Sequence, residues 1–160
     1  MAVLQIRYNL IERWAEKELI PYAEAHDIAV MAWSPIAKGA LTGKYTPENL
    51  PQFQDVRSSD PIFHPENLSS VWELVKVLKE LAEKYGKTPA QVALNWLIMS
   101  SSSVIPIPGA KNPQQVEDNA GGSRVEAELG RLENAGGAEQ EGTNNVLDTV
   151  LNHVGKPRNF

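Results

Sequence analysis

The 160-residue sequence has no cysteine, so neither disulfides nor thiolate metal sites hold its fold together, and a reducing compartment is compatible with it. Its three histidines lie far apart, without the spacing of metal ligands, and we expect no metal site. No window reaches the roughly 18 uninterrupted apolar residues of a membrane span. The first residues are too briefly apolar for a signal peptide. We therefore expect a cytoplasmic protein that does not enter membranes.

Positive charge is also sparse and scattered. The net charge of −5 and the absence of a basic run argue against a nucleic-acid surface. The sequence contains no Gly-x-Ser-x-Gly, Walker-type or Gly-x-Gly-x-x-Gly motif. With 42% hydrophobic and 22% charged residues, the composition is that of a globular protein with a sizeable core.

Three short apolar runs predict strands at 2–8, 28–33 and 104–107. Helical patterns separate and follow them, and the order of strand, helix, strand indicates parallel strands joined by right-handed crossovers. Three such units form an α/β layer but not a closed barrel, which needs eight strands and about 250 residues. The expected helices lie at 12–26, with its main part starting near Leu19, at 68–85, from Pro89 to the serines at 100–103, and from Asn112 to about Asn119.

The two central helices have the clearest signals. Leu68, Val71, Val75, Leu78, Ala82 and Tyr85 recur every three or four residues, as on a core-facing stripe that ends before Gly86. Thr88-Pro89-Ala90-Gln91 then predicts a capping box. We expect the second helix to bury Ala90, Ala93, Leu94, Leu97 and Ile98.

Two segments are less regular. Residues 34–66 contain five prolines and little periodicity, as in loops that are either functional or disordered. After Asn119, six glycines between 121 and 142 predict flexibility, and Val146, Leu147, Val150, Leu151 and Val154 predict a last amphipathic helix. We expect one domain over 1–121 and a divergent tail over 122–160.

Glycine and lysine follow two of the predicted strands. Lys38 comes after the second strand, and Gly109 and Lys111 come after the third, just before a helix capped by Asn112. Helix N-termini expose unpaired N–H groups, and glycine lets a phosphate approach the backbone, so the pattern suggests an anion site. The alternative is that Gly109 only turns the chain and Lys111 is a solvated side chain.

Two other residues at the strands leave similar alternatives open. Trp33 could stack on a flat ring or could simply belong to the core. Gln5 lies in an apolar strand and, if buried, needs hydrogen-bond partners from a ligand or from a neighbouring backbone.

Five segments together resemble the carboxyl-terminal half of the aldo-keto reductases. The likeness covers about residues 1–121 in unbroken order. The segments are Gln5-Ile-Arg-Tyr-Asn-Leu, Glu18-Leu-Ile-Pro-Tyr-Ala, Trp33-Ser-Pro-Ile-Ala-Lys-Gly-Ala-Leu-Thr-Gly-Lys-Tyr45, Lys87-Thr-Pro-Ala-Gln-Val-Ala-Leu-Asn-Trp96 and Val104-Ile-Pro-Ile-Pro-Gly-Ala-Lys-Asn112.

The resemblance implies a partial TIM barrel, in which these strands are the sixth to eighth of a (β/α)8 fold that reduces aldehydes and ketones with NADPH. It implies that Gln5 binds the nicotinamide carboxamide, that Trp33 stacks on the nicotinamide ring, and that a pyrophosphate lies along Ser34, Ile36 and Lys38. It further places the adenosine 2′-phosphate at Gly109, Ala110 and Lys111, with Gln115 nearby, and the adenine at Asp118 and Asn119.

The family's catalytic Asp, Tyr, Lys and His belong to the first half of the barrel, and Tyr8, Tyr22, Tyr45 and Tyr85 do not match the motif of the catalytic tyrosine. We therefore expect no catalytic residue in this chain. The leading hypothesis is a truncated, NADP(H)-binding half of an oxidoreductase for small carbonyl substrates. The alternative is a non-catalytic dinucleotide-binding or assembly module that acts with a partner or self-associates through exposed sheet edges.

Overall fold

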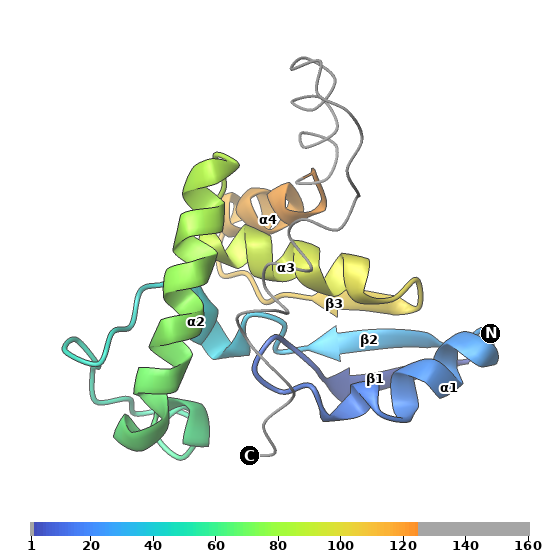
Figure 1. Ribbon diagram of the computed structural model, residues 1–160, viewed down its shortest axis with the longest axis horizontal. Helices are drawn as coiled ribbons and strands as arrows, with labels where there is room; N and C mark the ends of the chain where they lie inside the picture. Colours follow the sequence, from blue (N-terminus) through green and yellow to red (C-terminus); the bar gives the residue numbers. More distant parts are fainter. Residues whose placement is uncertain (1, 125–160) are drawn as a thin grey trace.

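The computed structural model describes residues 2–124. Three parallel strands, β1 (Val3–Arg7), β2 (Ala29–Trp33) and β3 (Val104–Ile107), lie side by side in the order β1-β2-β3 (Figure 1). Their carboxyl ends point the same way, toward the segment between β2 and α2 (Pro65–Lys84). The sequence-based prediction of three parallel strands is confirmed.

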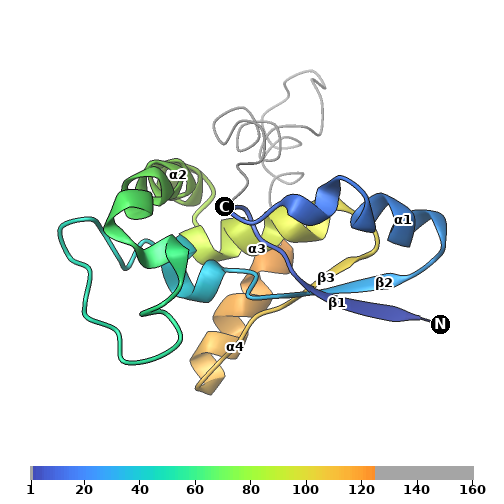
Figure 2. The same ribbon diagram turned by 90° about the horizontal axis from the view of Figure 1, so that it is seen from below.

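Helices cover one face of this sheet. Helix α1 (Leu19–Ala25) connects β1 to β2, whereas α2 and α3 (Pro89–Ser100) connect β2 to β3. Figure 2 shows α1 and α3 on the same side of the strands. Ile6, Val30 and Val104 point to this side and are buried in one core with Trp96 and Leu97 of α3.

The alternate side chains of the strands form the other face, which we call the open face. It comprises Val3, Gln5, Arg7, Ala29, Met31, Trp33, Ile105 and Ile107. Val3 and Ile105 are 55% and 51% exposed. Parallel sheets are usually buried on both faces. Within residues 2–124, this sheet is covered on one face only.

The helices follow their sequence signals closely. The predicted stripe of α2 is buried from Leu68 to Ala82, and Gly86 follows the helix with φ +61°. The capping box is present: Thr88 Oγ1 accepts from Gln91 N–H, and Gln91 Oε1 accepts from Thr88 N–H at 2.9 Å. The expected helix over 12–26 is instead a short 3-10 turn (Trp14–Glu16) followed by α1, whose start at Leu19 was predicted.

Two residues of α3 differ from the prediction that they are buried, because Ala90 is half-buried and Ile98 is 38% exposed. Ala93, Leu94 and Leu97 of the same helix are buried as predicted. Ile98 faces the outer edge of β3, which has no neighbouring strand within the described sheet. The periodicity of a helix shows which of its faces is apolar, but not whether another element packs against that face.

The proline-rich segment over 34–66 contains structure of its own. It includes two 3-10 segments, η2 (Ala37–Thr42) and η3 (Pro61–Phe63), and α2 already begins at Pro65. Tyr45, Phe53 and Phe63 pack edge to face, with ring centroids 4.9–5.8 Å apart. Because all three rings belong to this segment, their packing holds distant parts of it together.

The chain remains regular slightly beyond Asn119. Helix α4 (Pro113–Ala120) is followed by the 3-10 segment η4 (Gly121–Arg124), where Gly122 O accepts a hydrogen bond from the buried Asn95 at 3.1 Å. The prediction that flexibility starts after Asn119 is therefore wrong for residues 120–124. The predicted helix over 146–154 lies outside the described residues. No helix within residues 2–124 is long and apolar enough to span a bilayer.

Candidate functional site

The ends of the three strands bring distant residues together. Trp33 lies between Arg7 and Ile107 in the strand register, and Gly109 follows Ile107 by two residues. The side chains of paired residues on adjacent parallel strands project from the same face. The sheet therefore places the turn after β2 beside the turn after β3.

The turn after β2 has an unusual backbone. Ser34, Ala37 and Lys38 have φ values of 55°, 49° and 53°, in the left-handed region that non-glycine residues avoid, and Gly39 follows with φ 96°. Asn9, which is fully buried, donates from Nδ2 to Ser34 O at 3.1 Å and thereby supports this turn from the loop after β1. Such conformations concentrate at functional sites, where surrounding contacts hold them in place.

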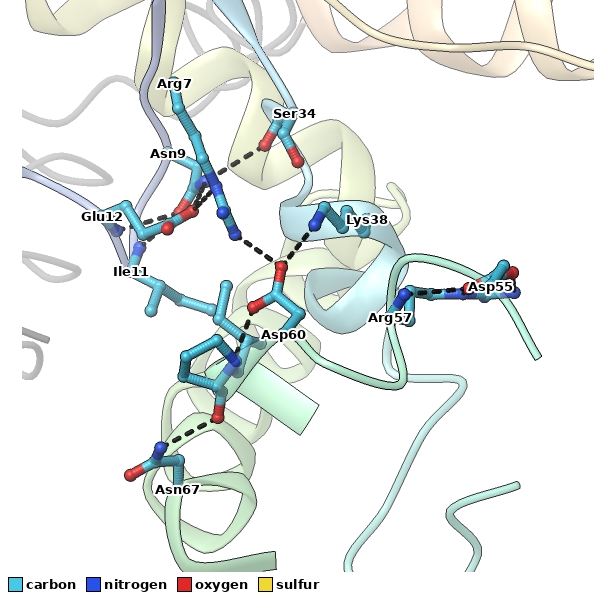
Figure 3. Close-up of polar contacts among 12 residues, drawn as sticks. Arg7, Asn9, Ile11, Glu12, Ser34, Lys38, Asp55, Arg57, Asp60 and Asn67 are labelled. Atoms are coloured by element: carbon cyan, nitrogen blue, oxygen red, sulfur yellow. Dashed lines mark hydrogen bonds and ion pairs between the residues drawn. The ribbon is translucent and has the colours of Figure 1, made fainter. Parts of the chain in front are cut away.

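A buried carboxylate ties the same turn to β1 (Figure 3). Asp60 Oδ2 accepts from Arg7 Nη2 at 2.8 Å and from Lys38 Nζ at 2.5 Å, and its Oδ1 accepts from Ile62 N–H. Burial alone would raise the pKa of Asp60. The hydrogen bonds from Lys38 and Ile62 and the charge of Arg7 outweigh that effect and lower its pKa below the usual value.

Lys38 is therefore not a free cation at the end of β2. Together with Glu12, whose Oε2 lies 2.5 Å from Arg7 Nε, the cluster holds two positive and two negative groups. We call Arg7, Glu12, Lys38 and Asp60 the ion cluster. Arg7, Asn9 and Asp60 were missed by sequence reasoning. Asp60 before Pro61 has the pattern of a helix cap, but nothing local indicates its partners.

Trp33 and Gln5 lie on the open face. Trp33 is 38% exposed, so the alternative that it is a core residue is wrong, and the Arg7 guanidinium carbon lies 5.5 Å from its ring centroid. Gln5, two residues before Arg7 on the same strand, is exposed, and its side chain makes no hydrogen bond within residues 2–124. Both side chains are thus accessible from the side of the sheet that helices leave uncovered.

The turn after β3 and the start of α4 supply the remaining predicted residues. Gly109, Ala110 and Lys111 are exposed, and the space around a Cβ at Gly109 is open to 4 Å. Asn112 caps α4 by accepting from Gln115 N–H at 2.9 Å, and Gln115 Oε1 accepts from Lys111 N–H at 2.7 Å.

Asp118 and Asn119, which the family resemblance assigns to the adenine, lie on the same helix. Asn119 Nδ2 donates to Gly109 O at 3.3 Å, which brings the carboxyl end of α4 back to the turn after β3. Asp118 is exposed and accepts from Gln114 on the same helix. Ile36, in the turn after β2, is half-buried, and its carbonyl accepts from Gly39 N–H at 2.9 Å.

These residues fit a dinucleotide in chemical type. A flat, partly exposed indole suits a nicotinamide ring. Ser34 Oγ has no hydrogen-bond partner among the described residues, as expected of a polar atom that a ligand satisfies, but it is buried, so contact with a phosphate oxygen requires the turn to move. Gly109 leaves room for a phosphate to approach the N-terminus of α4 closely. The first turn of α4 contains no acidic residue that would repel it.

An apolar cavity of about 540 Å³ lies between α3, β3 and α4 and is lined by Ile98, Ile105 and Val116 among others. It borders the candidate site, because Ala110 and Asn119 also line it. Within residues 2–124, no group of three His, Asp or Glu side chains is arranged to hold a metal ion.

Sequence comparison shows what this chain is similar to. It is 40% identical over 122 residues to an uncharacterized oxidoreductase of Mycobacterium tuberculosis, covering 76% of this chain and 37% of that protein. It is 30% identical to the aldo-keto reductase yakc [NADP(+)] of Schizosaccharomyces pombe (78% of this chain, 38% of that protein). It is also 30% identical to the NADH-specific methylglyoxal reductase of Escherichia coli (73% and 35%).

Structural comparison agrees. The glycerol dehydrogenase AKR11B4 of Gluconobacter oxydans superposes with a TM-score of 0.67 at 30% identity, covering 89% of this chain and 46% of that one. The chain thus spans well under half the length of the relatives that it matches. The family model described as the aldo/keto reductase family matches residues 1–129. This chain therefore belongs to the aldo/keto reductase family, and its three βα units form part of that family's barrel.

Proposed function

We propose that this chain forms the NADP(H)-binding part of a reductase for aldehydes and ketones. The observation that carries the proposal is the juxtaposition of an accessible Trp33 with the turns at Ser34 and Gly109, on one end of one sheet. Two of its relatives are reductases whose names give NADP(+) and NADH, which supports a nicotinamide cofactor in general.

Each residue has a stated part in this proposal. Trp33 stacks on the nicotinamide ring, and Gln5 binds its carboxamide. Ser34, Ile36 and Lys38 line the pyrophosphate, with Lys38 oriented by Asp60. The adenosine phosphate and adenine lie against α4 and the turn before it, at Gly109, Ala110, Lys111, Gln115, Asp118 and Asn119.

The chemistry of the bound cofactor is the transfer of a hydride to a carbonyl carbon. The residues of this chain bind and orient; none is proposed to donate a proton. Tyr8, for example, is buried on the covered side of the sheet and donates to Glu16 at 2.9 Å, and burial raises its pKa further. In this proposal, the acid that protonates the carbonyl oxygen belongs to the first half of the barrel, which the longer relatives contain.

Titration with NADPH tests the cofactor site. Bound dihydronicotinamide should quench tryptophan fluorescence by energy transfer. We expect Trp33→Leu to weaken NADPH binding severely, while Trp14→Phe, which alters an exposed tryptophan on the 3-10 turn before α1, leaves the affinity unchanged. Failure of the unaltered chain to bind millimolar NADPH would refute the proposal.

A second assay tests whether the chain binds the cofactor without catalysing carbonyl reduction. Because the chain lacks a proton donor in the proposed site, we expect no carbonyl-dependent oxidation of NADPH by the chain alone. Robust turnover with a simple aldehyde would show that a catalytic acid is present after all.

The second candidate function is a non-catalytic module that binds a dinucleotide and associates through its open face. The exposure of Val3, Trp33 and Ile105 on one face specifically favours it, because such faces are normally covered. Turnover that appears only when further βα units of a reductase are supplied would favour the first candidate over this one.

A further inference from the structure

Arg7 occupies a position that the proposed cofactor site does not explain. It is the last residue of β1, directly paired with Trp33, and it projects onto the open face. Its guanidinium carbon lies 5.5 Å from the centre of the Trp33 ring, within the range of a cation–π interaction. A long side chain at a strand end would normally be mobile in solvent, but the Arg7 side chain is only 22% exposed.

Two carboxylates hold the guanidinium in that place. Nη2 donates to Asp60 at 2.8 Å, and Nε lies 2.5 Å from Glu12. Asp60 is itself fixed by Lys38 and by Ile62 N–H, and its side chain is 2% exposed. Figure 3 shows Arg7, from the end of β1, and Lys38, from η2, converging on Asp60. The position of the guanidinium beside Trp33 is therefore set by the fold.

We propose that Arg7, held by Asp60, is a positioning residue that fixes the Trp33 ring and sets the preference of the nicotinamide subsite between NADPH and NADP⁺. This inference rests on the proposed function, because it presumes that Trp33 carries the nicotinamide. The physical basis is the charge of the ring, which is positive in NADP⁺ and neutral in NADPH.

Opposite substitutions in the ion cluster change the local charge in opposite directions. Arg7→Gln removes one of the two positive charges, so the cluster retains two carboxylates and one ammonium group. Its net negative charge favours the cationic ring of NADP⁺. Asp60→Asn leaves a surplus positive charge, which favours neutral dihydronicotinamide. Effects on the pyrophosphate through Lys38 are common to both redox forms, so they cancel in the ratio of the two dissociation constants.

The test measures Kd for NADP⁺ and for NADPH by titration of the full chain. We expect the ratio Kd(NADP⁺)/Kd(NADPH) to fall about three-fold in Arg7→Gln and to rise about three-fold in Asp60→Asn, as unit charges roughly 10 Å apart near a surface predict once screening by about 0.1 M salt is included. Arg7→Lys, which retains the charge, should restore the ratio. A merely structural role would weaken both ligands together and leave the ratio unchanged, which would overturn the inference.

A second readout needs no cofactor. The indole N–H resonance of Trp33, assigned by its loss in Trp33→Phe, should shift or broaden in Arg7→Gln and in Asp60→Asn. The matched control is Lys79→Gln, which removes a cation 4.6 Å from the Trp72 ring on α2 and should move the Trp72 resonance only. An unmoved Trp33 resonance in both variants would overturn the positioning role.

The two proposals fail in distinguishable ways. If the unaltered chain binds neither redox form, the proposed function fails, and the inference fails with it. If the unaltered chain binds both forms and neither variant alters the ratio, the cofactor site stands and only the role of Arg7 is wrong.

Discussion

Lys111 is the residue on which the choice between NADP(H) and NAD(H) depends in our proposal. Its side chain is exposed beside the start of α4, where its backbone N–H is already taken by Gln115. A 2′-phosphate would gain a charge-assisted contact from the ammonium group, whereas NADH carries only an uncharged 2′-hydroxyl at that position. We expect Lys111→Ala to weaken NADPH binding about five-fold, as for an exposed ion pair, and to leave NADH binding unchanged.

Lys87→Ala is a suitable companion for that measurement. It removes a lysine near the end of α2, outside the proposed cofactor residues. Both dissociation constants should match those of the unaltered chain. If Lys111→Ala weakens NADH binding as much as NADPH binding, Lys111 does not contact the 2′-phosphate.

Asp60 makes stability depend on pH in a predictable direction. Its pKa is lowered in the folded state, so its ion pairs stabilise the fold above the unfolded value of about 3.9, and this contribution disappears as the pH falls through the lower folded pKa. Asp60→Asn should cost roughly 1–3 kcal/mol at pH 7 because buried donors lose a charged acceptor.

Urea unfolding between pH 7 and pH 2, followed by circular dichroism, tests this point. The difference in unfolding free energy between the unaltered chain and Asp60→Asn should shrink as the pH falls below 4. A difference that is constant over the whole range would mean that the carboxylate charge contributes nothing.

Residues at this scale also show where sequence reasoning stops. Trp33, Ser34 and Gly109 could be singled out because strand ends and glycine turns are local signals. Lys38 could be named as a cation, but not as a cation already paired, because Asp60 lies 22 residues away and only the folded chain brings them together. Arg7 is hidden for the same reason, since its partner Asp60 lies 53 residues along the chain.

At the scale of elements, the start of α3 is the most strongly specified point of the fold. Thr88 and Gln91 exchange two hydrogen bonds, and Pro89 occupies the first turn, where no N–H is needed. Helix α3 packs the buried Trp96 and Leu97 against the sheet. Loosening its first turn should therefore destabilise the whole core. We expect Thr88→Ala to lower the unfolding free energy by about 1 kcal/mol.

The matched control is Ser69→Ala, an equally exposed hydroxyl within α2 that has no cap to satisfy. Because alanine favours the interior of a helix, this variant should be neutral or slightly stabilising. Equal losses in the two variants, measured by urea denaturation, would argue that the capping box is not what stabilises α3.

Such elements could be predicted because their signals are local. The caps at Thr88 and Asn112, and the glycine after α2, each lie within four residues of the bond or bend that they produce. Burial is different. Ile98 follows the periodicity of a core residue yet is exposed, because the burial of a helix face depends on a neighbour that need not be nearby in sequence.

Among residues 2–124, helices cover one side of the sheet and leave the other side open. The covered side is a continuous core between the sheet and α1 and α3, whereas the open face presents Val3, Trp33 and Ile105 to solvent. Both outer edges of the three-stranded sheet are unpaired within the described residues. In a family whose barrel has eight strands, this face and these edges are where the rest of the barrel would pack.

We therefore propose that the chain alone self-associates through the open face, since apolar side chains gathered on an uncovered sheet gain free energy when buried. Ile105→Thr keeps a β-branched residue in β3 but makes the face more polar, and it should shift the equilibrium toward monomer. Val56→Thr makes the same change at a loop residue that is 70% exposed and lies away from the sheet, and it should have no effect. Light scattering over a wide range of concentration gives the mass. A monomer throughout would mean that the open face is tolerated in water, and equal effects of the two variants would mean that association uses another surface.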